Sequence, residues 1–317
     1  MRFPSFLKTK YDRSWTPQTS TAVLFILCLM LFAGQIHGET PDPRCVRDDL
    51  GRQVCVSGVL KRLISFAPSL TEIIFALGAE NSLVGRTSRC SRPREASRIQ
   101  EIGAYLNPDL ERVMALRPDL VCATKTGVRE ELVHRLSELG IPVFVDDSRS
   151  LDDICLLLKR LGTLLGRETE ADKLVQEFQK RREVIRGRIE GAVKPSVLFA
   201  VGVRPLVVAG GKSFLGALIR EAGGQNIAEN ESIPFPRYSF EEVNKRDPDL
   251  ILVLDKECRD EECLDQLRRY STLRAVTNSR VYSMDADLMA RPAPRILEGL
   301  ELLAAIFHPE LPRGGLH

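Results

Sequence analysis

The chain has 317 residues, of which 44% are hydrophobic and 28% are charged, so it can bury a core and is not a largely disordered, collagen-like or coiled-coil protein. Its 45 Lys and Arg residues against 43 Asp and Glu residues leave a net charge of +2, without the basic surplus of a nucleic-acid-binding protein, so no nucleic-acid partner is expected. A chain of this length is expected to form about two domains.

Residues 1–38 have the pattern of a secretory signal peptide. Basic side chains such as Arg2 and Arg13 precede an apolar run, Ala22–Ala33, and small residues follow it. The apolar run is shorter than the ~20 residues that a helix needs to cross a bilayer. We therefore expect cleavage after Gly38 and a periplasmic protein, with an uncleaved membrane anchor as the alternative.

The cysteines predict disulfides, because export leads to an oxidising compartment. Cys45 and Cys55 bracket a turn signal at 49–51, which indicates a hairpin whose facing cysteines can bridge. Cys258 and Cys263 flank a short acidic segment and are a second candidate pair. The other cysteines after residue 38 are expected to be small buried hydrophobic residues; they are Cys90, Cys122 and Cys155.

The first half of the chain alternates short apolar runs with amphipathic segments, which is the pattern of an α/β layer fold. Ser69 and Glu72 have the spacing of a capping box, so we expect Ser69 to cap a helix that stops at Gly78. The expected strands cover 62–67, 83–85, 120–123 and 143–145, and the expected helices cover 69–77, 110–116 and 129–139.

A long helix is expected next, over 168–190, because this segment lacks proline and repeats apolar residues at helical spacing. Its length would be roughly 35 Å at 1.5 Å per residue. The α/β pattern then restarts, with strands at 197–201, 250–254 and 281–284 and helices at 213–221, 241–245 and 295–306. We expect an N-terminal lobe at 39–166 that starts with the 45–55 hairpin, a connecting helix at 167–193 and a C-terminal lobe at 194–312.

An internal repeat supports two similar lobes. Residues 110–121 align without gaps on 240–251, so that Glu111 matches Glu241 and the Pro-Asp pair that ends at Asp119 matches the pair that ends at Asp249. In each copy an acidic helix ends in Pro-Asp and leads into an apolar strand. The alternative is chance, because Pro-Asp turns join helices to strands in many α/β domains.

The motifs of common enzymes are absent: the chain has no G-x-S-x-G, no H-E-x-x-H and no Walker loop. After residue 38 the histidines are few and far apart, at His134, His308 and His317, which argues against histidine acid–base catalysis and against zinc. We expect no catalytic residue, resident metal or cofactor. Two α/β lobes would instead form a cleft between them, which is a preferred place for a small ligand.

Several segments, in their order along the chain, resemble one family. They are 48–52, 62–78, 103–113 and 291–301. Together they resemble the periplasmic substrate-binding proteins of ABC importers for vitamin B12, haem and iron–siderophores, the helical-backbone class, from about residue 45 to 307. The segments Ser-Phe-Ala-Pro-Ser-Leu-Thr-Glu and Leu-Asn-Pro look closest to the cobalamin-binding subgroup.

The resemblance implies an α/β fold of two Rossmann-like lobes joined by a single long backbone helix, with a ligand cleft between the lobes. It also implies a monomer that delivers a metal chelate to a permease dimer in the membrane. Glu111 and Glu241 match the two glutamates that dock on arginines of the permease. The alternative for each is stabilisation of the first turn of a helix.

The resemblance further suggests ligand-binding residues. These are Ser69, Arg89, Tyr105, Phe235 and Arg291. Rings at Tyr105 and Phe235 can stack on a macrocycle, and the two arginines can contact carboxylate or phosphate groups, with loop packing and surface charge as the alternatives.

A corrinoid ranks first as the ligand, but the only tryptophan is Trp15, whereas the vitamin B12 binders use several. A ferric siderophore or haem is therefore the alternative ligand. Two other functions stay open: a secreted α/β enzyme with a carboxylate site in the same cleft, and a sensor that works without a permease.

Overall fold

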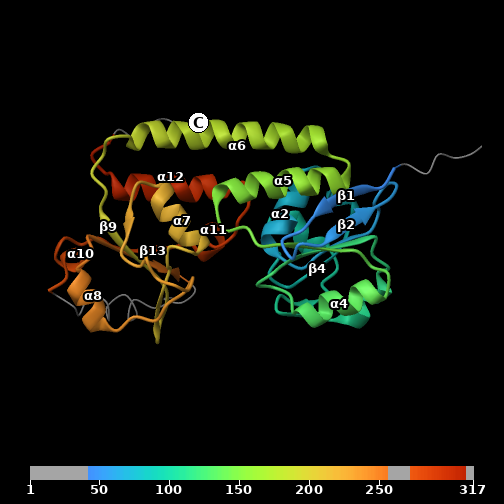
Figure 1. Ribbon diagram of the computed structural model, residues 1–317, viewed down its shortest axis with the longest axis horizontal. Coiled ribbons are helices and arrows are strands. Elements are labelled where there is room, and N and C mark those ends of the chain that lie inside the picture. Colours follow the sequence, from blue (N-terminus) through green and yellow to red (C-terminus); the bar gives the residue numbers. More distant parts are fainter. Residues whose placement is uncertain (1–41, 256–271, 312–317) are drawn as a thin grey trace, which may run out of the picture. The chain divides into compact units, whose positions relative to one another are not determined.

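The computed structural model describes residues 42–255 and 272–311 (Figure 1). The expected signal peptide, 1–38, and the candidate pair Cys258 and Cys263 lie outside the described residues. The described elements belong to one unit that begins at Asp42 and contains two mainly parallel β-sheets. We call the parts built on these sheets the first lobe and the second lobe, in chain order.

The first lobe is built on a four-stranded parallel sheet in the order β4-β3-β7-β8. Its strands are β3 (Leu63–Ser65), β4 (Leu83–Arg86), β7 (Leu120–Thr124) and β8 (Val143–Asp146). Its helices are α2 (Pro68–Ala76), α3 (Leu110–Ala115), α4 (Glu130–Glu138) and α5 (Leu151–Leu165), with short 3₁₀ turns at Glu80–Ser82 and Arg94–Arg98. Every residue of β7 and β8 is buried, which explains their continuous apolar runs.

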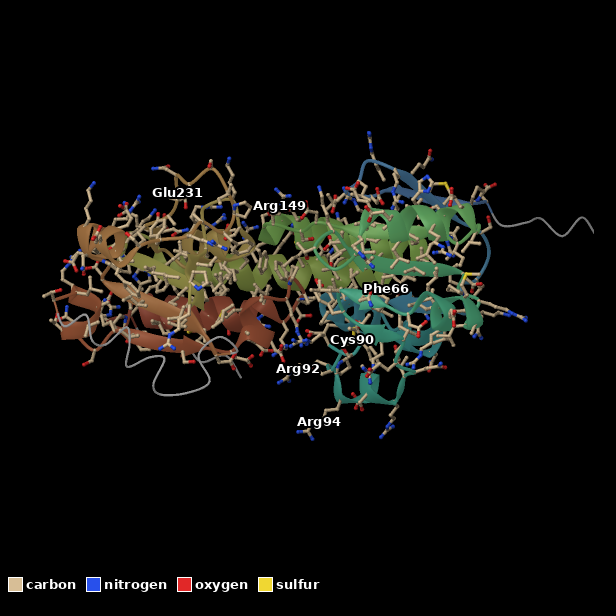
Figure 2. All side chains as sticks on the ribbon, turned by 90° about the horizontal axis from the view of Figure 1, so that it is seen from below. Phe66, Cys90, Arg92, Arg94, Arg149 and Glu231 are labelled. Atoms are coloured by element: carbon tan, nitrogen blue, oxygen red, sulfur yellow. A yellow bond between two sulfur atoms is a disulfide. The ribbon has the colours of Figure 1, made fainter. Side chains whose placement is uncertain are left out.

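The loop after β4 carries exposed side chains, unlike the interior of this lobe. Phe66 follows β3 and is fully buried, whereas Arg92 and Arg94 extend outward from the loop that contains Cys90 (Figure 2). Cys90, Cys122 and Cys155 are buried and unpaired, and burial raises the pKa of the Cys122 thiol to about 12.

The expected capping box at Ser69 is wrong. Helix α2 begins at Pro68, its N-cap is Ala67, and no side chain caps it. A proline at the first helical position needs no hydrogen-bond partner for its nitrogen, so the capping signal of Ser69 is not used. Ser69 lies within the first turn, and the Glu72 carboxylate pairs with Arg291 instead.

The second lobe repeats this architecture in the order β10-β9-β12-β13, with a short strand β11 also paired to β9. The strands are β9 (Ser196–Val203), β10 (Leu206–Val208), β11 (Gln225–Asn226), β12 (Leu250–Leu254) and β13 (Val281–Met284). The helices are α7 (Phe214–Glu221), α8 (Phe240–Arg246), α10 (Arg274–Thr277), α11 (Ala286–Met289) and α12 (Ile296–Phe307). Among the described strands of this sheet, β10 runs antiparallel to β9, and the other pairs are parallel.

The internal repeat is a structural repeat. The Asp119 carboxylate accepts hydrogen bonds from the backbone of Lys61 and Arg62 at 2.7 and 2.9 Å, just before β3. Asp249 likewise accepts a hydrogen bond from the Ser196 backbone at 2.8 Å, at the start of β9. Arg117 and Asp247 hold matching positions, both with positive φ, of 44° and 39°. Each lobe therefore contains one copy of the same helix–turn–strand unit, and chance does not explain the alignment.

A single long helix, α6 (Glu168–Ile189, 22 residues), connects the lobes. It packs against α5 of the first lobe and α12 of the second (Figure 1). Arg182 of α6 donates hydrogen bonds to Asp152 of α5 and, at 2.6 Å, to Glu221 of α7. One hydrophobic cluster also runs through both lobes, from β3 to β9 and α12. The connector is thus a packed helix and not a free hinge.

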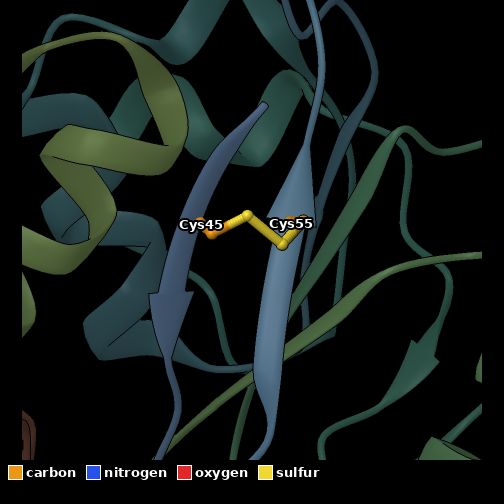
Figure 3. The surroundings of a disulfide bond; sticks show 2 residues. All are labelled: Cys45 and Cys55. Carbon is orange, nitrogen blue, oxygen red and sulfur yellow. A yellow bond between two sulfur atoms is a disulfide. The ribbon is translucent and has the colours of Figure 1, made fainter. Parts of the chain in front are cut away.

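An N-terminal hairpin precedes the first sheet. Strands β1 (Arg44–Arg47) and β2 (Gln53–Val56) pair antiparallel and place Cys45 opposite Cys55. The two sulfurs form a disulfide with an S–S distance of 2.04 Å (Figure 3). Asp49 in the turn fixes the hairpin to the end of β8, because its carboxylate accepts a hydrogen bond from the Asp147 backbone at 2.8 Å and pairs with Arg160 at 2.6 Å.

Replacing both hairpin cysteines, Cys45→Ser/Cys55→Ser, should lower the free energy of unfolding by ~2–3 kcal/mol, because the disulfide closes a short loop in the unfolded chain. Urea denaturation followed by circular dichroism measures the change. Gln53→Ser on the exposed face of β2 is the control and should change stability by less than ~0.5 kcal/mol. Equal stability of the double variant and the control would contradict a stabilising role for this bond.

Candidate ligand-binding cleft

A cleft of about 510 Å³ is lined by residues of both lobes. The first lobe contributes the segments that follow β3, β7 and β8, and the second contributes the start of α7, the loop around Phe235 and the region of α11. The carboxyl ends of parallel strands are the usual edge for ligands in α/β folds, and this volume suits a small-molecule site.

All five ligand-binding candidates line this one cleft. They are Ser69, Arg89, Tyr105, Phe235 and Arg291. They come from five separate segments of the chain, and the fold brings them together. That they contact a ligand stays a prediction.

Tyr105 lies in the turn between the short strands β5 (Gly103–Ala104) and β6 (Asn107–Pro108). Its hydroxyl lies 3.1 Å from the Thr124 hydroxyl and 3.3 Å from the Thr126 hydroxyl. Its ring rests on Gly127, where an added Cβ would lie only 2.5 Å from a ring carbon. The ring is thus positioned by contacts on two sides, and it offers a half-buried apolar surface to the cleft.

The second lobe offers rings of its own. Phe235 is 48% exposed, and Phe214, the first residue of α7, lines the same cleft. Ser213 caps this helix, and its hydroxyl accepts a hydrogen bond from the Gly216 backbone at 3.0 Å. Aromatic side chains from both lobes therefore face one cleft, which suits a ligand with a broad apolar face.

Arg291 ties the two lobes together. Its guanidinium pairs with Glu72 of α2 at 2.8 Å and with Asp287 of α11 at 2.9 Å, and Arg295 lies 3.6 Å from the second Glu72 oxygen. The Arg291 and Glu72 side chains are only 8% and 10% exposed. Two carboxylates thus balance the charge of Arg291. Arg89, by contrast, has no acidic partner among the described residues.

A buried carboxyl group also lines the cleft. Asp146, the last residue of β8, is 2% exposed and accepts a hydrogen bond from the Ser148 hydroxyl at 2.6 Å. Burial raises its pKa to about 7; hydrogen bonds from Ser148 oppose this shift, and the carboxylates of Asp49 and Asp147 add to it.

Sequence reasoning did not single out Asp146, Thr124 or Phe214 as cleft residues. A signal was present, because Thr124 and Asp146 are polar residues directly after predicted buried strands, where α/β folds place their binding groups. Phe214 directly follows Ser213, the first residue of a predicted helix, but periodicity alone does not tell which helix start meets the other lobe.

The two docking candidates occupy equivalent positions. Glu111 lies in the first turn of α3 and Glu241 in the first turn of α8, and both are exposed. Asp109 caps α3 and Ser239 caps α8 through their side chains. Neither glutamate forms an ion pair within the described part of the chain. Each lobe therefore presents one free carboxylate at the same place.

The described residues contain neither a cluster of metal-binding side chains nor a membrane-spanning helix. Within 42–255 and 272–311, no three His, Cys, Asp or Glu side chains gather as a metal site requires. In the same ranges, no helix has the length and apolar character to cross a membrane.

Comparisons with known proteins identify similar chains. A family described as "Periplasmic binding protein" matches residues 63–288. A vitamin B12-binding protein of Vibrio parahaemolyticus is 26% identical over 241 residues, which cover 76% of this chain and 87% of the relative. YvrC of Bacillus subtilis, an uncharacterized ABC transporter substrate-binding lipoprotein, is 28% identical over 275 residues, which cover 84% of this chain and 86% of the relative. The apo structure of the periplasmic heme-binding protein RhuT from Roseiflexus sp. RS-1 has a TM-score of 0.72 and 26% identity, and the match covers 80% of this chain and 99% of that one.

Proposed function

We propose that this chain, which belongs to the periplasmic binding protein family, captures a corrinoid in the cleft between its lobes and delivers it unaltered to the permease dimer of an ABC importer. The observation that carries this proposal is the placement of aromatic side chains from both lobes, Tyr105 and Phe235, in one cleft. Such rings offer stacking and apolar area to a flat macrocycle. The protein would act outside the cytoplasm, as a monomer.

The choice of a corrinoid rests on two supports. One of the cobalamin-like segments lines the cleft through Ser69, and Tyr105, which also lines it, directly precedes the other segment. Relatives named vitamin B12-binding proteins match this chain over three quarters of its length.

Haem is the second candidate ligand, because RhuT is a heme-binding protein and the cleft contains a tyrosine. A tyrosine oxygen is one of the protein groups that can ligate haem iron. The alternative of another class, an enzyme, rests on the neighbouring carboxyl groups of Asp146 and Asp147 in the cleft.

Titration calorimetry with cyanocobalamin, haem and a panel of ferric siderophores tests the proposed ligand class. We expect saturable binding of one cyanocobalamin per chain and a rise in melting temperature with ligand concentration, because a ligand that binds only the folded state stabilises it. Binding of haem or a siderophore with no response to cyanocobalamin would replace the corrinoid with that ligand.

Tyr105→Ala should weaken cyanocobalamin binding by about tenfold or more, because a stacked ring contributes on the order of 1.5 kcal/mol. Calorimetry measures the loss. Tyr105→Phe is the matched control: it keeps the ring and removes only the hydroxyl contacts with Thr124 and Thr126, so affinity should stay close to wild type. A Phe variant as weak as the Ala variant would contradict stacking as the role of this residue and favour a contact through its hydroxyl group.

A further inference from the structure

We propose that Asp146 selects among the polar groups at the periphery of the ligand. Its carboxyl group accepts hydrogen bonds from neutral amides and disfavours a ligand carboxylate at the same place. This inference rests on the proposed function, because a corrinoid carries peripheral amides whereas haem carries carboxylates.

The position of Asp146 is the first argument. The residue ends β8, at the edge of the first sheet where the cleft opens, and it is among the residues that line the cleft although it is 2% exposed. Its Oδ1 accepts the hydrogen bond from Ser148. No basic side chain of residues 42–255 and 272–311 forms an ion pair with it.

The other carboxylates of this region are each balanced by a cation. Asp147 pairs with Arg149 at 2.6 Å and lies 3.7 Å from Lys125, and Asp49 pairs with Arg160 at 2.6 Å. The remaining charged side chains that line the cleft are Arg89, Lys212, Asp287 and Arg291. Asp146 is therefore the buried acid here without a direct counter-charge, and a second carboxylate placed beside it would meet like-charge repulsion.

The ionisation of Asp146 makes this discrimination depend on pH. Because burial holds its pKa at about 7, with Asp49 and Asp147 adding to the shift against the opposing hydrogen bonds of Ser148, the group is a neutral acid below neutral pH and a carboxylate above it. The neutral acid can donate a hydrogen bond to a ligand carboxylate, but the carboxylate repels it. Amides can pair with either form, so the preference for amide over carboxylate should grow as pH rises.

The test compares cyanocobalamin with its monocarboxylic acids, in each of which one peripheral amide has been hydrolysed. Calorimetry at pH 6 and pH 8 gives the ratio of the affinity for cyanocobalamin to the affinity for each acid. For the most affected acid we expect this ratio to rise about fivefold or more from pH 6 to pH 8 in the wild-type protein, because the ligand carboxylate meets a like charge once Asp146 ionises. In Asp146→Asn the ratio should not change with pH. Asp172→Asn, at an exposed position of α6, is the charge-matched control and should behave as wild type.

The possible outcomes distinguish failure of the corrinoid function from failure of the role of Asp146. Wild-type protein that fails to bind cyanocobalamin at either pH overturns the corrinoid function and this inference with it. Wild-type protein that binds cyanocobalamin but shows a ratio independent of pH, or the same pH dependence in Asp146→Asn, overturns the role of Asp146 alone.

A second variant keeps the test decisive if Asp146→Asn does not fold. Asp49→Asn removes a neighbouring negative charge that raises the pKa of Asp146, so this pKa should fall in the variant. The midpoint of the rise in the affinity ratio should therefore move to lower pH. An unchanged midpoint would overturn the inference.

Discussion

Replacing both docking candidates, Glu111→Lys/Glu241→Lys, should abolish ligand uptake while ligand affinity stays near the wild-type value. Both side chains are exposed at equivalent first turns of α3 and α8, one on each lobe, and both lack ion-pair partners among the described residues. A pair of matching charges on two similar lobes suits a partner that is itself two-fold symmetric. In the proposed docking on permease arginines, reversing the charges would turn attraction into repulsion, and like-charge contacts at an interface cost several kcal/mol.

The measurement is uptake of labelled ligand by membrane vesicles that contain the cognate permease, with calorimetry on the same variant. Glu130→Lys/Glu177→Lys makes the same change of net charge at exposed positions of α4 and α6, and should leave uptake intact. Loss of the first-turn acids should cost at most ~1 kcal/mol per helix, which does not unfold the protein. Undiminished uptake by the Glu111/Glu241 variant would show that these residues do not dock.

Arg291→Met should lower the free energy of unfolding by ~3–5 kcal/mol, because removing one partner of a buried ion pair leaves the other charge without compensation. Glu72, only 10% exposed, would keep just the more distant Arg295. The pair joins α2 of the first lobe to the region of α11 in the second, so its loss should also loosen the contact between the lobes. Urea denaturation measures the stability.

Two further variants give this prediction its controls. The double variant Glu72→Gln/Arg291→Met removes both charges and should be less destabilised than the sum of the single variants. Arg92→Met, at an exposed position of the first-lobe loop that contains Cys90, should change stability by less than ~0.5 kcal/mol. A loss below ~1 kcal/mol in Arg291→Met would show that the interlobe pair does not stabilise the fold.

Much of the fold could be predicted because its strongest signals are local. The buried strands β7 and β12 are uninterrupted apolar runs, and α6 lacks any proline from Glu168 to Ile189. Helix α5 (Leu151–Leu165) was not predicted, although Ser150 caps it and Gly166 ends it in the left-handed conformation. Its sequence is mostly apolar, because the helix packs between α6 and the first lobe, and it therefore lacks the long charged stretch that marks α6.

The site was less accessible to sequence reasoning, because its geometry joins residues far apart in the chain. Tyr105 and Phe235 were suggested by the family resemblance, and the fold places both in the cleft. The partner of Arg291, in contrast, lies 219 positions away at Glu72, where a local capping pattern gave the wrong role. The role of Asp146 likewise depends on burial and on the hairpin residue Asp49, which no local pattern connects to it.

A carrier binds its ligand and releases it unchanged, so recovery of the ligand after binding is the sharpest test of the proposed function. Purified protein is equilibrated with cyanocobalamin, the complex is separated from free ligand, and the released ligand is counted and analysed by mass spectrometry. We expect one cyanocobalamin per chain, released chemically unchanged after prolonged incubation. Conversion of the ligand to a product, or no retained corrinoid at saturating concentration, would contradict the proposed function.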